Sequence, residues 1–141
     1  MKEYTSTAII AASPETVWKI LTDGARYRQW NPEIVGVDGR IGLGERITAH
    51  VRLGSGAIRT VTQRVTSFDE RKRMEWEGGL PLGLFVGRRS FTLTPVTDGV
   101  EFKLQLKMSG PFLSLILKSV GDRQPEIDSF VAALKNRAEK N

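Results

Sequence analysis

The stretch from Val100 to Met108 alternates strictly between apolar and polar side chains. Valine, phenylalanine, leucine or methionine occupies every even position, and glutamate, lysine or glutamine occupies the positions between. Successive side chains of a β-strand point to opposite faces, so this pattern predicts a strand with one buried face and one face in water. Half-buried strands of this kind are typical of antiparallel sheets, because parallel sheets are covered on both faces.

The same strand signal recurs through most of the chain. Turn residues, chiefly glycine and aspartate, separate one apolar pattern from the next. Repeated hairpins therefore predict a strongly curved antiparallel sheet of about seven strands. The clearest strand segments are residues 3–12, 47–53, 58–68, 74–78, 91–95 and 100–108.

Two short helices are predicted directly after the first strand. Ser13 is a favourable N-cap, and Pro14 suits the first helical position, where a missing N–H costs nothing. A second helical piece, Ala25–Trp30, ends before Asn31 and Pro32.

The last 30 residues follow a helical period instead. Apolar residues recur at helical spacing over 112–120 and again over 127–134, and the segment Gly121–Pro125 interrupts them. Asp122 could cap a new helix there, with Pro125 in its first turn. We therefore expect a broken or kinked C-terminal helix whose apolar stripe lies on the concave face of the sheet.

Composition narrows the possible functions. The 141 residues are the size of one domain, so we expect a single domain over residues 1–141. The absence of cysteine excludes disulfides, thiolate metal sites and a thiol nucleophile. The single histidine, His50, is predicted to face solvent, and no metal or cofactor is expected. The longest apolar run, Ala8–Ala12, is too short for a membrane span, and the N-terminus lacks a signal-peptide pattern, so we expect a cytoplasmic protein.

The net charge of +5 would favour acidic partners, but the basic residues are scattered. No run of five like charges and no recognition motif is present, so nucleic-acid binding is not expected. Nothing in the pattern decides between a monomer and a homodimer.

Several short motifs, taken with the order of elements, resemble one known superfamily. They are Ala12–Trp18, Tyr27, Trp30–Pro32, Gly42–Glu45, Met74–Gly78, Phe91–Pro95, Asp98–Gly99 and Ser109–Pro111. On these residues the chain resembles the START-like (SRPBCC), or helix-grip, superfamily, in particular its bacterial polyketide cyclase/dehydrase and lipid-transport branch. The likeness spans nearly the whole chain, and its motifs are structural rather than catalytic.

The resemblance implies an α+β helix-grip fold, in which a curved antiparallel sheet wraps around a long C-terminal helix. It also implies a deep, mostly apolar cavity between the sheet and that helix. Members of the superfamily bind lipids, sterols, polyketides or plant hormones there, and a minority do chemistry on them. The superfamily has no universal catalytic residue, so the resemblance implies none in this chain.

Arg89 is the first candidate for ligand contact. It shares the predicted inward face of its strand with Phe91, so it could pair a ligand carboxylate or phenolate. A buried arginine without a partner is costly, so it needs either a ligand or an internal acid. Glu45, Glu75 and Glu77 are the candidates for this internal acid.

Other candidates would orient the ligand or form the cavity wall. Gln63 lies between Val61 and Val65 on the predicted apolar face. The unusually apolar connection Leu80–Phe85 and the start of the last helix are expected to frame the entrance, and this rim is a candidate for transient contact with a membrane. The predicted ligand-binding residues are Gln63, Trp76, Phe85, Arg89, Phe91, Leu104, Leu106, Phe112, Leu115 and Ile116.

These observations favour a non-catalytic protein that binds or transports a small hydrophobic ligand of lipid, polyketide or aromatic type. One alternative is an enzyme, a cyclase or dehydratase acting on a polyketide-like substrate, in which Arg89 would stabilise a developing enolate. The other is a ligand-free module for protein interaction, which would use the basic outer face of the sheet.

Overall fold

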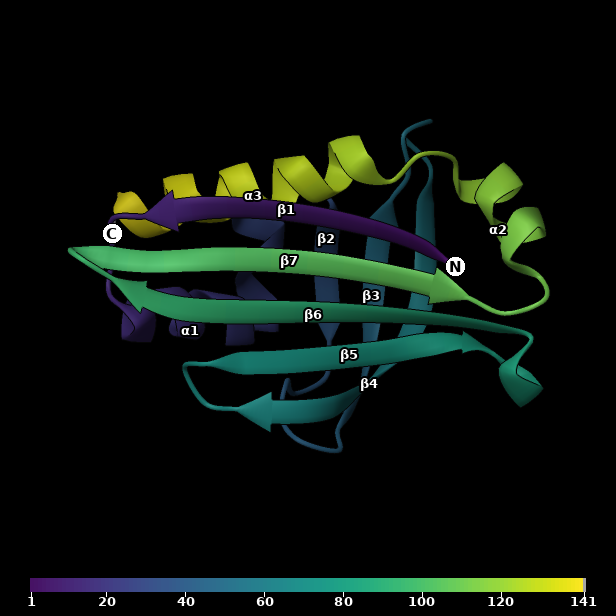
Figure 1. The fold of residues 1–141 in the computed structure, drawn as a ribbon, viewed down its shortest axis with the longest axis horizontal. Coiled ribbons are helices and arrows are strands. Elements are labelled where there is room, and N and C mark those ends of the chain that lie inside the picture. Colours follow the sequence, from purple (N-terminus) through teal and green to yellow (C-terminus); the bar gives the residue numbers. More distant parts are fainter. Residues whose placement is uncertain (141) are drawn as a thin grey trace.

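The computed structural model describes residues 1–140, which form one curved antiparallel sheet and the helices that cover it. The strand order in the sheet is β1-β7-β6-β5-β4-β3-β2. The strands are β1 (Lys2–Ile10), β2 (Ile34–Asp38), β3 (Arg46–Arg52), β4 (Ile58–Asp69), β5 (Arg73–Leu80), β6 (Phe85–Val96) and β7 (Gly99–Ser109). Figure 1 shows β5, β6 and β7 in front and β2 and β3 behind, so the sheet curls around the interior. The predicted α+β helix-grip fold is confirmed.

The alternation in β7 has the predicted effect on burial. Val100, Phe102, Leu104 and Met108 are buried, whereas Glu101 and Lys107 are exposed. Strands β2 to β7 form a meander, in which each strand pairs with the next one along the chain. Strand β1 is the edge strand and pairs with β7.

Two short helices follow β1, as predicted. Helix α1 (Pro14–Thr22) begins after Ser13, whose hydroxyl accepts a hydrogen bond from the Thr16 N–H at 3.1 Å. The second piece is the 3₁₀ helix η1 (Gly24–Gln29). Asn31 ends this region, because its side-chain oxygen accepts from the N–H groups of Glu33 and Ile34 and turns the chain into β2.

The C-terminal helix is broken rather than kinked. Helix α2 (Leu113–Val120) ends at Gly121, whose φ of 74° lies in the left-handed region that favours glycine. Helix α3 (Gln124–Glu139) then begins after Arg123, and Asp122 accepts a hydrogen bond from the Gln124 N–H at 3.0 Å. The capping position is thus one residue later than the sequence suggests.

Of the two C-terminal helices, α3 packs along the sheet. Its apolar stripe, Ile127, Phe130, Val131 and Leu134, is buried, and the helix runs along β1 (Figure 1). Helix α2 instead stands at the end of the sheet, near the 3₁₀ turn η2 (Pro81–Gly83), and none of its residues is fully buried. The expected packing on the concave face is complete for α3, whereas the apolar residues of α2 are only partly buried against the core, because the chain turns at Gly121.

The core joins the concave face of the sheet to α1, η1 and α3. Aromatic rings dominate its centre: Phe130 of α3 lies within 5.6–6.4 Å of Trp30, Phe91, Tyr27 and Phe102, centroid to centroid. Within residues 1–140 no helix is long and apolar enough to cross a membrane.

Candidate functional site

A cavity of about 430 Å³ lies at the end of the sheet that α2 covers. Its wall comes from β3 to β7, from α2 and from the connection between α2 and α3. Most of the wall is apolar, and its apolar members include Val61, Phe85, Leu106, Met108, Ile116 and Val120.

The structure divides the predicted ligand-binding residues into three groups. Gln63, Phe85, Arg89, Leu106 and Ile116 line the cavity. The second group, Trp76, Phe91 and Leu104, is fully buried in the core outside the lining. The third group, Phe112 and Leu115, is exposed on the outer surface.

Phe130 explains why the core residues are not on the cavity wall. Its ring lies 5.9 Å from that of Phe91, which in turn lies 4.8 Å from Trp76, centroid to centroid. The space over these strands is therefore filled by α3. The cavity remains only beyond the break at Gly121, where α2 turns away from the sheet.

Arg89 lines the cavity but is already paired. Its Nη1 and Nη2 donate to Oε1 and Oε2 of Glu33 at 2.7 and 2.6 Å, a bidentate pair buried from solvent. The acids predicted as partners are engaged elsewhere or exposed: Glu75 pairs with Arg73, Glu77 pairs with Arg88, and Glu45 is exposed. The buried carboxylate that pairs with Arg89 is therefore that of Glu33.

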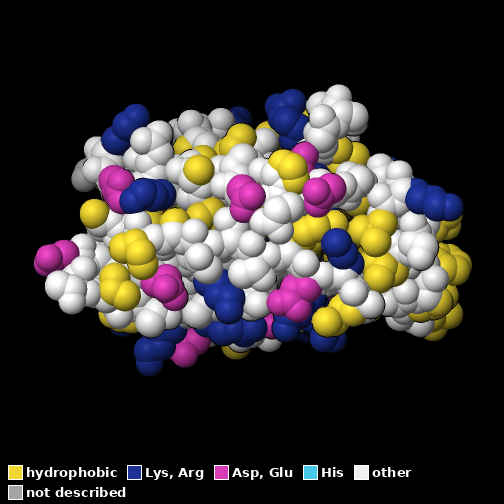
Figure 2. All heavy atoms as spheres, turned by 45° about the horizontal axis from the view of Figure 1, so that its top comes forward, with side chains coloured by type: hydrophobic (Ala, Val, Ile, Leu, Met, Phe, Trp, Pro, Cys, Tyr) yellow, Lys and Arg dark blue, Asp and Glu magenta, His cyan; other side chains and the backbone are white. Residues whose placement is uncertain are grey.

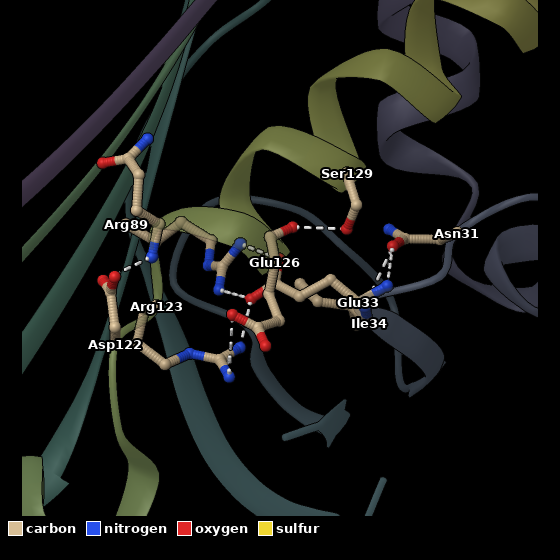
Figure 3. A network of polar contacts seen from close by, with 9 residues as sticks. Asn31, Glu33, Ile34, Arg89, Asp122, Arg123, Glu126 and Ser129 are labelled. Carbon is tan, nitrogen blue, oxygen red and sulfur yellow. Dashed lines mark hydrogen bonds and ion pairs between the residues drawn. The ribbon is translucent and has the colours of Figure 1, made fainter. Parts of the chain in front are cut away.

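A second buried arginine shares the same carboxylate (Figure 3). Arg123, which precedes α3, donates from Nη2 to Oε2 of Glu33 at 2.9 Å and also lines the cavity. Its Nη1 lies 4.0 Å from Oε2 of Glu126, one turn into α3. Neither of these two buried atoms has a hydrogen-bond partner within residues 1–140. Two guanidinium groups of the cavity lining and two carboxylates outside that lining thus form one cluster, and their formal charges cancel.

Sequence reasoning missed Glu33 and Arg123 as site residues. Glu33 lies in the connection after Pro32, and Arg123 lies in the helix interruption, so neither belongs to a periodic segment. The sequence points to Glu33 only indirectly. An arginine on the inward face of a strand requires a buried carboxylate, but the tertiary fold is needed to show which one.

Tyr27 packs beside this cluster. Its hydroxyl donates to the backbone oxygen of Leu21 at 2.5 Å, and the side chain is completely buried. Burial raises the pKa of Tyr27 far above the ordinary tyrosine value, and the nearby Arg89 only partly opposes this. The phenol therefore stays neutral and acts as a fixed donor.

The lining offers binding groups rather than a proton-transfer group. Among the described residues of the cavity wall, the charged side chains are Arg59, Arg89 and Arg123, and there is no carboxylate, imidazole or phenol. Arg59 is exposed and donates to Ser119 Oγ at 2.9 Å. His50 lies apart from the lining, where its Nε2 is 2.8 Å from Asp38 Oδ2.

Apolar side chains gather around the same end of the molecule (Figure 2). Leu80, which lines the cavity, is exposed, and Leu82 at the tip of η2 is 98% exposed. Phe112 and Leu115 are also exposed, and the Phe112 N–H donates to the Leu84 oxygen at 2.9 Å, which joins the two segments.

A wider hollow of about 620 Å³ lies at the opposite end, beside α1. Long charged side chains, among them Glu15, Lys19, Arg40, Glu70 and Arg71, form much of its rim. It has no buried polar cluster in its lining, so the cavity under α2 is the better candidate despite its smaller volume.

The structure is an α+β fold with a cavity between a curved antiparallel sheet and the C-terminal helices. The family model for polyketide cyclase / dehydrase and lipid transport matches residues 1–139, and the chain belongs to this family. Comparison with curated proteins gives no match.

Solved structures show the same fold at low sequence identity. A START superfamily protein from Mycobacterium smegmatis is 20% identical with a TM-score of 0.73, covering 98% of this chain and 97% of that one. The Zhui aromatase/cyclase from Streptomyces sp. R1128 is 17% identical with a TM-score of 0.76, covering 99% and 94%. A hypothetical protein from Helicobacter pylori is 15% identical with a TM-score of 0.78, covering 97% and 88%.

Proposed function

We propose that this protein binds or carries a small hydrophobic molecule in the cavity under α2. The observation that carries the proposal is the cavity itself. Its volume of about 430 Å³ falls in the range of small-molecule sites, and its wall is mostly apolar with a few polar groups.

Burial of the ligand's apolar surface would drive binding, at roughly 25 cal/mol per Å² removed from water. Leu106, Met108 and Ile116 would supply contact area, and Gln63 and the arginines would set the ligand's orientation. Helix α2 provides the entry route, because it buries no side chain fully and lies between Gly110 and Gly121, both at positive φ.

Binding is favoured over cyclase or dehydratase chemistry by the composition of the wall. A cyclase of this type needs a proton-transfer group beside the substrate. The described lining residues include arginines that could stabilise an enolate but no acid or base, and the carboxylates next to them, Glu33 and Glu126, are outside the lining and face those arginines.

A cavity-filling variant tests the proposal. Gly87 lines the cavity on β6, and a Cβ placed there would lie 3.7 Å from the Phe85 ring, at ordinary contact distance. Gly87→Leu should therefore extend into the cavity without straining the strand. We expect the neutral dye N-phenyl-1-naphthylamine to bind the unmodified protein at one site, and Gly87→Leu to weaken binding about tenfold or more, or about 1.4 kcal/mol.

The matched control is Thr94→Leu, on the same strand but on its exposed side. It adds a leucine to β6 outside the cavity, so dye affinity should stay unchanged. Thermal unfolding of both variants checks that the fold is intact. Equal dye binding by Gly87→Leu, or no saturable binding by the unmodified protein, would contradict the proposal and bring the protein-interaction alternative forward.

A further inference from the structure

The charged cluster at the inner end of the cavity contains an unmatched donor and an unmatched acceptor. Arg123 Nη1 and Glu126 Oε2 are both buried and lie 4.0 Å apart, and neither has a hydrogen-bond partner among the described residues. That distance is too long for a direct hydrogen bond. Buried polar groups are nearly always satisfied, so this pair requires an explanation.

The other groups of the cluster are already satisfied by one another. Glu33 accepts two hydrogen bonds from Arg89 and one from Arg123 (Figure 3). Helix α3 holds Glu126 in its first turn, and a Cβ on Gly54 would lie 2.9 Å from Glu126 Oε1, so the turn after β3 packs against that oxygen. Arg123 is therefore fixed by Glu33, and Glu126 is fixed by α3 and the turn at Gly54.

The geometry of the pair matches a single oxygen atom that both accepts and donates. An oxygen at about 2.8 Å from each partner spans a 4.0 Å gap without strain. A hydroxyl group can accept from the arginine N–H and donate its own proton to the carboxylate. An ether can only accept, and a carboxylate can only accept.

The charge of the cluster selects against an acidic ligand. Arg89 and Arg123 are balanced by Glu33 and Glu126, so a ligand carboxylate would add a third negative charge to two positive ones in a buried place. Arg59, the remaining lining arginine, is exposed and would attract an anion only weakly through solvent.

We propose that the cavity takes a neutral hydrophobic molecule bearing a hydroxyl group, an alcohol or a phenol, whose hydroxyl bridges Arg123 Nη1 and Glu126 Oε2. The inference rests on the proposed binding function and names its ligand class. Arg123 lines the cavity beside Val120, so the apolar body lies against α2 and β7 while the hydroxyl reaches the buried pair. The two atoms of the unmatched pair are closed to solvent, so the hydroxyl reaches them when the Arg123 side chain, which lines the cavity, shifts to admit it.

A series of naphthalenes of nearly equal size tests the ligand class by displacement of N-phenyl-1-naphthylamine at neutral pH. We expect 2-naphthol, which donates and accepts, to bind about tenfold tighter than 2-methoxynaphthalene and naphthalene, because a hydrogen bond to a charged group is worth about that factor. The anion 2-naphthoate should bind no better than naphthalene. Equal affinity for naphthol, its methyl ether and naphthalene would overturn the proposal and indicate that a water molecule fills the gap.

Glu126→Gln tests the pair itself. The substitution replaces the carboxylate by a neutral amide, which is a weaker acceptor, and leaves the cluster with one excess positive charge, so the preference for 2-naphthol should fall and that for 2-naphthoate should rise. Asp128→Asn is the control, because Asp128 lies on the same helix but accepts a hydrogen bond from Gln124 Nε2 and has no ion pair with Arg123. An unchanged naphthol preference in Glu126→Gln would overturn the assignment.

If Glu126→Gln fails to fold, the naphthalene series on the unmodified protein still tests whether the cavity prefers a ligand with a hydroxyl group. The two proposals also fail differently. Dye binding without naphthol selectivity removes only the hydroxyl site, whereas absence of dye and naphthalene binding removes the binding function and the hydroxyl site together.

Discussion

Glu33 holds together two arginines that come from distant parts of the chain, β6 and the start of α3. Three hydrogen bonds of 2.6–2.9 Å reach its two carboxylate oxygens, and the residue is completely buried. Such a pair stabilises little compared with an apolar replacement, but breaking it leaves buried charges unmatched. The cluster therefore fixes the position of α3 against the sheet next to the cavity.

Removing the Glu33 charge should be strongly destabilising. We expect Glu33→Gln to lower the free energy of unfolding by about 3–5 kcal/mol, because Arg89 and Arg123 lose their common partner. Urea unfolding measures this, with Glu77→Gln as control, since Glu77 pairs with Arg88 on the exposed face and should change stability little. Similar losses in the two variants would contradict the assigned role of Glu33.

Tyr27 predicts a dependence of stability on alkaline pH. Burial raises the pKa of its phenol, so the folded state holds the proton more tightly than the unfolded state. The stabilisation is complete below the unfolded value of about 10 and is lost progressively as the pH rises above it. The free energy of unfolding, followed by urea titration above that pH, should fall more steeply in the unmodified protein than in Tyr27→Phe; parallel curves would argue against a buried phenol.

At the scale of elements, the break between α2 and α3 decides where the cavity lies. Helix α3 fills the concave face through Phe130, and Gly121 directs α2 away to the end of the sheet. The sequence could predict this break, because Gly121 and Pro125 interrupt the helical period. It could not predict the direction of α2, since the apolar residues of both segments look alike when counted along the chain.

Strand alternation likewise predicted most of the sheet and only half of the candidate site. It correctly placed Arg89 and Gln63 on the concave face, because period two is a local property of the backbone. It could not separate Leu106, on the cavity wall, from Leu104, two residues earlier in the core, because that difference depends on where Phe130 packs. Glu33 was missed because loop residues carry no such period.

The C-terminal end of α3 is tied to β1 and yields an element-scale prediction. The Ala11 N–H donates to Glu139 Oε2 at 2.9 Å, and Lys135 Nζ donates to the same oxygen at 2.6 Å and to the Ile9 oxygen at 2.7 Å. The backbone hydrogen bond, assisted by Lys135, holds the pKa of Glu139 below its ordinary value. Its stabilising effect is thus present at neutral pH and is lost as the pH falls through that lowered value.

A carboxyl NMR titration of Glu139 checks this tie. We expect its pKa to lie below that of an unperturbed glutamate and to rise in Lys135→Met, which removes one of the two donors. An ordinary pKa for Glu139 in the folded protein would show that α3 is not held to β1 through this side chain.

At the scale of the whole molecule, the two ends differ. One end is closed by α1, η1 and the C-terminal part of α3, where the core is densely aromatic. The other end holds the cavity, helix α2 between Gly110 and Gly121, and the exposed apolar side chains Leu82 and Leu115. A hydrophobic molecule thus has two places to bind at this end, the cavity and the outer apolar surface.

A crystal structure of the protein with N-phenyl-1-naphthylamine distinguishes these two places and tests the central claim most directly. The account predicts the dye inside the cavity, in contact with Gly87, Leu106 and Ile116 and beneath α2. A dye molecule lying on the outer surface against Leu82 and Leu115, with the cavity unchanged, would contradict it.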